Sequence, residues 1–391
     1  MLTARCAAVG IAVSAGAALV LLRRRRRALA LRVRPVVRFG VMGCANIAKK
    51  FCVSVRESGS AIVCGVASRD AHKAAMWISE NCPGATAYAS YYDLLADDTI
   101  EAVYIPLPTA LRTEWALRAA ARGKHVLLEK PVGPNAAEAA RIVAACRKYG
   151  VIYMDNTMFM HHGRLSAMRA ALDEPEFGQP CLVASSFSVP VDESDMAANI
   201  RSQRALEPLG AIGDLAWYNV RFTLWAFDYD APLRVSCHVH ATSADGGSLA
   251  ASAVLVYADG RYATFDCSFR HSLRQWGEVS SASRTLYLDD FVIPQSDTSH
   301  FSISEGCVGE KAIHFLKRVL RTTSVEEPLR QHASLVHTFA TLVRTGDTNS
   351  FWEGQAFWPH VSLLTQTVVD ACAASAEKDG AWVDVASVPA A

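Results

Sequence analysis

The sequence lacks a C-x-x-C pair, a large net charge of either sign and any low-complexity linker, and the first two absences each exclude a class of protein. Its 11 cysteines stand singly, which is typical of free thiols in a reducing compartment and fits neither a disulfide framework nor a zinc site. A formal net charge of +1 argues against nucleic acid as the main partner. With 51% hydrophobic and 20% charged residues, the chain is globular, and its 391 residues predict two domains.

Acidic residues are also missing before Glu57, whereas arginine is concentrated there, above all in Arg23 to Arg27. Residues 6 to 22 carry no charge and would reach roughly 25 Å as a helix, slightly short for a bilayer. We expect residues 1–35 to form an N-terminal membrane anchor. Its arginine-rich flank and the rest of the chain would then lie in the cytosol. A transit peptide for the mitochondrion is the alternative. A secretory signal is disfavoured because the arginines follow the apolar run.

From residue 36 the pattern V-V-R-F-G-V-M-G-C-A-N-I-A-K-K predicts a strand, a tight turn and the start of a helix. Gly43, Ala45 and Ala48 occupy the glycine positions of the dinucleotide fingerprint G-x-G-x-x-G, where the backbone must approach a pyrophosphate at a helix N-terminus. Two of the three are alanine, so the motif is weak alone. The cofactor-binding residues expected here are Gly40, Gly43, Cys44, Ala45, Asn46 and Ile47.

Strands and helices alternate up to residue 157, which predicts a doubly wound parallel sheet in an NAD(P)-binding Rossmann domain of residues 36–157. The second strand, 61–67, ends at Ser68-Arg69, where an arginine suits a 2′-phosphate, so NADP is expected and NAD is possible. The turn Pro106-Leu107-Pro108 follows the strand at 102–105. A further apolar strand ends in Glu129-Lys130-Pro131, at the edge where such sheets bind ligands.

Residues 158–391 predict a second α/β domain with an open, mostly antiparallel sheet. Its expected strands are 233–242, 249–257, 261–269 and 284–293, with a hairpin turn at 258–260, and its late helices are 327–345 and 359–377. In G-A-I-G-D-L-A-W-Y, Asp214 and Tyr218 are four apart and would share one helix face. Taken alone they could be a capping residue and a core aromatic. His161 and His162 have no third ligand in a fitting motif, so no metal is predicted.

These motifs, in this order, resemble the family of glucose-fructose oxidoreductase, inositol dehydrogenase and dimeric dihydrodiol dehydrogenase (Gfo/Idh/MocA-like oxidoreductases). The resemblance covers roughly residues 36 to 385 and is nearest to a plant-type branch, in V-M-G-C-A-N-I-A, V-A-S-R, V-Y-I-P-L-P-T, L-L-E-K-P-V, M-D-N-T-M and G-A-I-G-D-L-A-W-Y. It implies a Rossmann domain joined to an α/β domain, often a homodimer through the open sheet. It also implies hydride transfer between NAD(P) and a secondary alcohol of a sugar, cyclic polyol or dihydrodiol.

By the same resemblance, the family's catalytic Lys falls on Lys130, its helix Asp on Asp214, and its acid/base on Tyr218. A free tyrosine with a pKa near 10 is a poor base at neutral pH, and a neighbouring ammonium is expected to lower that pKa. Arg112 stands where the plant-type branch commonly has His, and His162-Gly163 stands where it has Asn-Pro. Both lie near the expected substrate side, so the identity of the substrate cannot be carried over from the family. Two alternatives remain: a catalytically silent NADP-binding regulatory or scaffold protein, and an NAD-dependent glycosidase.

Overall fold

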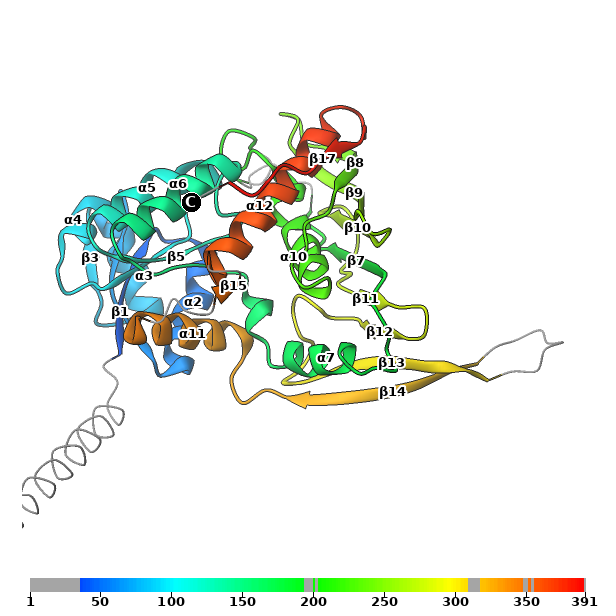
Figure 1. Ribbon diagram of the computed structural model, residues 1–391. Coiled ribbons are helices and arrows are strands. Elements are labelled where there is room, and N and C mark those ends of the chain that lie inside the picture. Colours follow the sequence, from blue (N-terminus) through cyan, green and yellow to red (C-terminus); the bar gives the residue numbers. More distant parts are fainter. Residues whose placement is uncertain are drawn as a thin grey trace, which may run out of the picture.

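Two β-sheets, with helices packed between and around them, form the body of the molecule (Figure 1). The computed structural model describes residues 36–192, 200, 203–308, 317–346, 351–352 and 355–389. One sheet is formed within residues 37–155 and the other within residues 182–384, and they lie at opposite ends of the body, so the helices between them can contact both.

The first sheet has six parallel strands in the order β3-β2-β1-β4-β5-β6. β4 is buried along its whole length, as expected of a parallel strand that is covered on both faces. The strands are β1 (Val37–Met42), β2 (Ala61–Ala67), β3 (Thr86–Tyr88), β4 (Ala102–Ile105), β5 (His125–Leu128) and β6 (Tyr153–Asp155). The helices between them are α2 (Asn46–Ser58), α3 (Ala71–Asn81), α4 (Tyr91–Ala96), α5 (Thr109–Ala121) and α6 (Ala136–Lys148).

The strand order of this sheet reverses between β1 and β4. Loops that leave two neighbouring strands in opposite directions open a crevice at the carboxyl edge, and open α/β sheets bind their ligands there. Gly43 follows β1 and Pro106 follows β4. The two predicted cofactor segments therefore lie at the reversal point.

The second sheet has nine strands in the order β14-β13-β12-β11-β7-β10-β9-β8-β17. Among these described strands, β7 and β10 pair in parallel and the other neighbours pair antiparallel. The strands are β7 (Leu182–Ser188), β8 (Arg234–Thr242), β9 (Ser248–Val256), β10 (Tyr262–Ser268), β11 (Gly277–Ser280), β12 (Thr285–Leu288), β13 (Thr298–Val308), β14 (Lys317–Glu326) and β17 (Val383–Asp384). A small separate pair is formed by β15 (Phe351–Trp352) and β16 (Gln355–Ala356).

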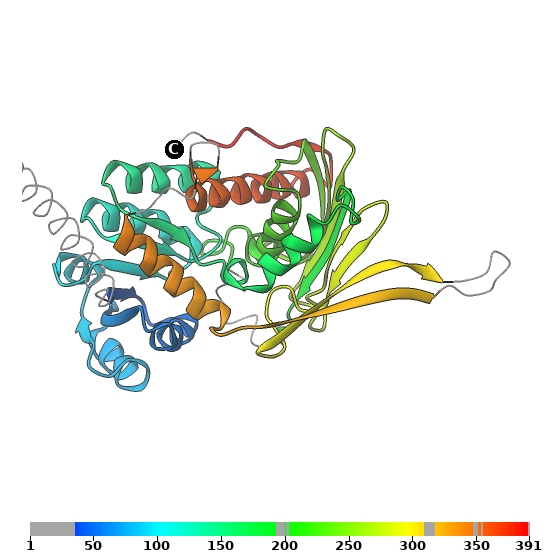
Figure 2. The same ribbon diagram turned by 60° about the horizontal axis from the view of Figure 1, so that its bottom comes forward.

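Helices cover the face of this sheet that looks toward the first sheet (Figure 2). They are α9 (Gly210–Asp214), α10 (Ala216–Ala226) and α12 (Phe357–Ala376). Every residue of α10 is buried, because it packs against both β7 and α12. The remaining elements are η1 (Met158–His161), α7 (Arg164–Leu172) and α11 (Gln331–Thr345), and α11 returns to pack on α2.

The fold class expected from the sequence is confirmed: a parallel doubly wound sheet followed by a mostly antiparallel one. Differences lie in single elements. The strand expected over 284–293 ends at Leu288, and α11 begins at Gln331 rather than near 327. The helix expected to hold both Asp214 and Tyr218 is interrupted at Leu215, between α9 and α10. β7, β11, β13 and β14 were not predicted.

The expectation of a membrane-anchored protein, with its transmembrane helix and its localisation, is corrected. Across the described part of the chain, no helix has both the length and the apolar character needed to cross a membrane. Residues 6 to 22, on which the expectation rested, lie outside the described residues. An uncharged run is a necessary feature of a membrane-spanning helix, but it is not sufficient evidence for one.

Candidate active site

The turn after β1 presents backbone rather than side chains. Gly43 has a φ of +105°, which only glycine adopts without strain, and its N–H donates to the Ala67 carbonyl at 2.8 Å. Helix α2 then begins after Ala45, and no side chain caps its N-terminus. Cys44 and Ala45 are small and half-buried, and Asn46 is exposed. A helix N-terminus without a cap, reached through small residues, fits the pyrophosphate of a dinucleotide.

Gly40, expected to contact the cofactor, lies instead within β1 and is buried. A Cβ there would stand 2.7 Å from Cδ2 of Leu94, in α4. The glycine is therefore needed so that α4 can pack on the sheet. Ile47 is half-buried in the first turn of α2.

The loop after β2 carries the predicted phosphate contact. Ser68 is buried and its Oγ accepts from the Asp70 N–H at 3.3 Å, while Asp70 caps α3. Arg69 is exposed between them. Its positive charge acts on the nearby phenol of Tyr91, whose pKa is raised by burial and lowered in part by Arg69. A free arginine at this strand end fits a 2′-phosphate.

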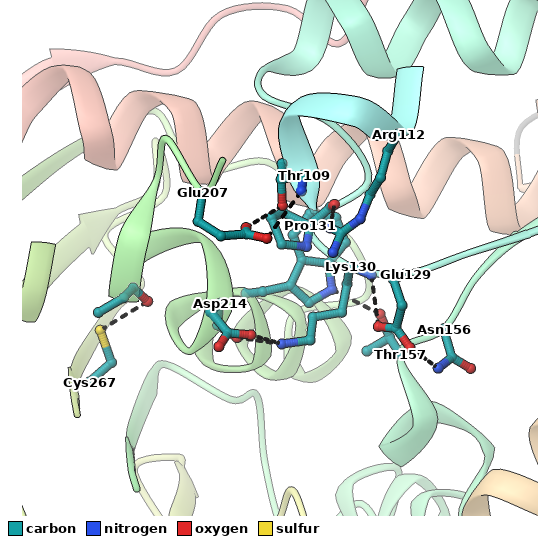
Figure 3. Close-up of polar contacts among 12 residues, drawn as sticks. Thr109, Arg112, Glu129, Lys130, Pro131, Asn156, Thr157, Glu207, Asp214 and Cys267 are labelled. Carbon is teal, nitrogen blue, oxygen red and sulfur yellow. Dashed lines mark hydrogen bonds and ion pairs between the residues drawn. The ribbon is translucent and has the colours of Figure 1, made fainter. Parts of the chain in front are cut away.

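Glu129 is a buried carboxylate at the end of β5. It accepts hydrogen bonds from the Tyr104 hydroxyl and the Asn156 amide, both at 2.5 Å, and from the Lys130 N–H at 3.2 Å. These partners come from the ends of β4, β5 and β6. Glu129 therefore fixes the strand end from which the Lys130 side chain leaves (Figure 3).

The structure brings Lys130, Asp214 and Tyr218 together from two distant segments. The Lys130 ammonium forms an ion pair with the Asp214 carboxylate and also donates to the Asp214 carbonyl at 2.7 Å (Figure 3). The same ammonium lies 4.4 Å from the centre of the Tyr218 ring. Phe187 packs edge-on against that ring, with 5.2 Å between the centroids. Asp214 thus orients the lysine, one of the two roles that its spacing left open.

Burial and charge act in opposite directions on the two titratable groups. Burial by itself would lower the pKa of Lys130, but the charge of Asp214, followed by that of Tyr218, raises this pKa overall. Burial raises the pKa of Tyr218, and the charge of Lys130 lowers it only in part. The expectation that Lys130 makes Tyr218 more acidic than a free phenol is therefore wrong, because desolvation is the larger effect. At neutral pH the pair consists of an ammonium and a protonated phenol.

The two neighbouring histidines do not join this group. The His161 ring stacks on Trp358, with 4.6 Å between centroids, and burial lowers the pKa of His161 to about 3. His162 Nδ1 lies 3.0 Å from Oε1 of Glu327. Within the described residues, no group of three or more His, Cys, Asp or Glu side chains is placed to hold a metal ion.

Three residues around the site had no role from the sequence: Arg112, Asn156 and Glu207. The Glu207 carboxylate accepts from the Thr109 N–H at 3.1 Å and from the Thr109 hydroxyl, at the start of α5. Arg112 donates to two backbone carbonyls, and Asn156 to Glu129. Pro108 precedes α5 and has no side chain that could accept a hydrogen bond from the first N–H groups of that helix. This was a signal in the sequence that the acceptor must come from another segment. Asn156 lies in M-D-N-T-M, so the motif marked it without giving its role.

Comparison with protein families and known proteins gives matches along most of the chain. A family model described as an oxidoreductase family with an NAD-binding Rossmann fold matches residues 37–157, and one for the GFO/IDH/MocA C-terminal domain matches residues 165–286. A D-xylose 1-dehydrogenase (NADP(+)) of Haloferax volcanii is 31% identical over 310 residues, which are 79% of this chain and 90% of that protein. A trans-1,2-dihydrobenzene-1,2-diol dehydrogenase of Mus musculus is 29% identical over 62% of this chain and 72% of its own.

Among solved structures, a 3-ketoreductase from Actinomadura kijaniata in complex with NADP and TDP-benzene is similar with a TM-score of 0.74 and 25% identity. It covers 87% of this chain and 98% of its own. The ranges matched by the two family models contain Lys130 on one side and Asp214 and Tyr218 on the other.

Proposed function

Because the chain belongs to the GFO/IDH/MocA oxidoreductase family, we propose that it transfers a hydride between NADP(H) and the secondary alcohol or carbonyl of a sugar, cyclic polyol or trans-dihydrodiol. The observation that carries this proposal is the buried Lys130 ammonium, paired with Asp214 and lying against the Tyr218 ring. In this proposal, residues 36–157 bind the cofactor and residues 158–391 form the substrate-binding domain.

The cofactor would be held at the point where the first sheet reverses its strand order. The Gly43 turn and the N-terminus of α2 would hold the pyrophosphate, and Arg69 with Ser68 the 2′-phosphate. The residues that would line its nicotinamide half are Pro106, Leu107, Pro108, Glu129 and Lys130. When bound, the dinucleotide supplies or accepts the hydride.

Lys130 and Tyr218 would have different roles at the substrate oxygen. The Lys130 ammonium binds that oxygen and stabilises the negative charge that develops on it. The Tyr218 hydroxyl donates its proton to the same oxygen during reduction and takes it back during oxidation. Asp214 keeps Lys130 charged and aimed. The raised pKa of Tyr218 keeps its phenol protonated at neutral pH, which is the form that reduction needs.

A cofactor-coupled screen of the full chain tests this function. NADPH oxidation is followed with ketoses, oxidised cyclic polyols and dicarbonyls, and NADP reduction with xylose, inositols and trans-dihydrodiols at alkaline pH. Tyr218→Phe and Lys130→Met should each reduce turnover of an accepted substrate by roughly a hundredfold or more, with NADPH binding retained. Tyr149→Phe, at an exposed tyrosine, is the matched control.

Net consumption of NADPH would also exclude the glycosidase, which restores its cofactor in each cycle. Tight NADPH binding without turnover of any compound in the screen would instead favour the silent scaffold. Wild-type turnover in Tyr218→Phe would assign proton transfer to another residue.

A further inference from the structure

Arg112 lies in α5 with only 6% of its surface exposed, and its guanidinium donates hydrogen bonds to two backbone carbonyls. Its Nε donates to the Leu107 carbonyl at 2.8 Å, and its Nη1 donates to the Pro131 carbonyl. Leu107 belongs to the loop after β4, and Pro131 to the loop after β5. One guanidinium therefore joins the two loops at the carboxyl edge of the sheet (Figure 3).

Each of these carbonyls belongs to a residue that touches a further part of the site. A Cβ on Gly43 would stand 3.3 Å from Cδ2 of Leu107, so Leu107 lies against the fingerprint turn. A Cβ on Gly213 would stand 3.3 Å from Cγ of Pro131, so the Pro131 ring lies against α9 beside Asp214. Arg112 thus holds the backbone between the cofactor turn on one side and the Lys130 and Asp214 pair on the other.

We propose that Arg112 is a positioning residue for hydride transfer: it fixes the 106–108 loop and the Lys130-Pro131 segment relative to each other, so that Lys130 meets the substrate oxygen in line with the cofactor. This inference rests on the proposed function for its kinetic consequence, whereas the bridge itself is a property of the fold. Arginine suits the task because its planar fork carries several donors in fixed directions. A neutral imidazole has one N–H donor and cannot serve both carbonyls.

The same geometry explains why Arg112 does not act on the substrate itself. Two of its nitrogens are directed at main-chain oxygens of the two loops, and the residue is buried. Loss of the bridge should consequently change the rate of the chemical step more than the affinity for either ligand. A shift of about 1 Å in a catalytic group can reduce turnover by about a hundredfold.

The test compares Arg112→Met, Arg112→Lys and Arg118→Met in the full chain. Arg118 lies on the same helix, pairs with Glu114 at the surface, and serves as the matched control. Hydrogen exchange is measured for peptides covering residues 104–114 and 126–136, together with the Kd for NADPH, KM, kcat and the midpoint of thermal unfolding.

In Arg112→Met we expect faster exchange in both peptides and a fall in kcat of roughly a hundredfold, with KM and the NADPH Kd changed by less than about threefold. Arg112→Lys, which can reach one carbonyl, should fall between this variant and the wild type. Arg118→Met should match the wild type in all readouts. If Arg112→Met does not fold, Arg112→Lys decides alone.

Two results would overturn the inference: exchange in both peptides equal to that of Arg118→Met, or an unchanged kcat alongside a lower unfolding midpoint, which would show a structural role only. A wild-type chain that turns over none of the compounds would contradict the proposed function. In that case the exchange data still decide whether Arg112 holds both loops.

Discussion

At the scale of single residues, the raised pKa of Tyr218 predicts opposite pH dependences for the two reaction directions. Reduction needs the protonated phenol, which dominates below this pKa, and oxidation needs the phenolate, whose fraction grows as pH rises. Between roughly pH 6 and pH 9, kcat for reduction should stay level, and kcat for oxidation should rise by up to about tenfold per unit. Profiles at saturating cofactor measure both. An oxidation rate that stays flat over this range would remove Tyr218 from the proton step.

Arg69 gives a second prediction at this scale, for the choice of cofactor. A charge-assisted hydrogen bond contributes roughly 1.5 to 3 kcal/mol, which corresponds to a preference for NADP over NAD of about tenfold to a hundredfold. Arg69→Ala should raise the Kd for NADPH and leave that for NADH nearly unchanged, as measured by nicotinamide fluorescence. Arg122→Ala, at the exposed end of α5, is the control. Equal losses for both cofactors would mean that Arg69 only shapes its loop.

At the scale of secondary-structure elements, Asp155 and Arg221 tie β6 to α10. Both side chains are 0% exposed, and their ion pair spans 3.0 Å. Ser362 of α12 donates to Asp155, and Arg221 Nε donates to the Thr365 hydroxyl at 2.7 Å. Burial alone would raise the pKa of Asp155, but Arg221 and these donors hold it below its ordinary value. The pair therefore fixes α10, and with it Tyr218 one turn earlier, against the first sheet.

Removing one member of this pair should destabilise the protein more than removing both charges. Arg221→Met leaves a buried carboxylate without its partner and should lower the free energy of unfolding by about 3 to 5 kcal/mol. Asp155→Asn combined with Arg221→Met should recover part of that loss. The control is Arg141→Met, which breaks an exposed pair with Glu138 and should change stability by less than about 1 kcal/mol. Urea unfolding measures the stability of all three variants. Similar midpoints for Arg221→Met and Arg141→Met would contradict the anchoring role of the Asp155 and Arg221 pair.

Elements could be predicted from the sequence where the pattern is local. Apolar strands bounded by Gly and Pro gave the first sheet, since each strand is recognisable without its neighbours. The break at Leu215 could not be seen, because its flanking residues are compatible with one continuous helix. β13 and β14 mix polar and charged residues with few apolar ones, and their hairpin pairing and the burial of Phe301 and Ile303 become evident only in the structure.

The candidate site divides in the same way. The turn at Gly43 and the end of β5 follow from local spacing, whereas the meeting of Lys130 with Asp214 depends on tertiary packing and came from the family resemblance. Glu207 caps a helix that begins 98 residues earlier, and Arg112 binds main-chain oxygens. Contacts of these kinds leave no periodicity or motif that identifies the partner residue, so only the structure gives their roles.

At the scale of the whole molecule, one face of the nine-stranded sheet has no helix over it in the described chain (Figure 2). The strand registers align a row of residues across this face, from Tyr287 through Glu278, Ala184 and Thr264 to Val254. Tyr262 and Val254 remain 43% and 37% exposed there, and Tyr287 39%. Apart from Glu278 the side chains of this row are uncharged, and such a row on a broad sheet face suits a self-complementary contact between two copies of the chain.

We propose that this face forms a homodimer. Light scattering on the full chain should give twice the 42.3 kDa mass of one chain. Val254→Arg should shift the mass toward the monomer, because a two-fold axis would bury an unpaired guanidinium from each copy. NADPH affinity should not change, since the cofactor turn lies on the other sheet. Met76→Arg, at a residue of α3 that is 56% exposed, provides the matched control and should leave the mass unchanged. A monomeric wild type, or a dimer that persists in Val254→Arg, would place any assembly on another surface.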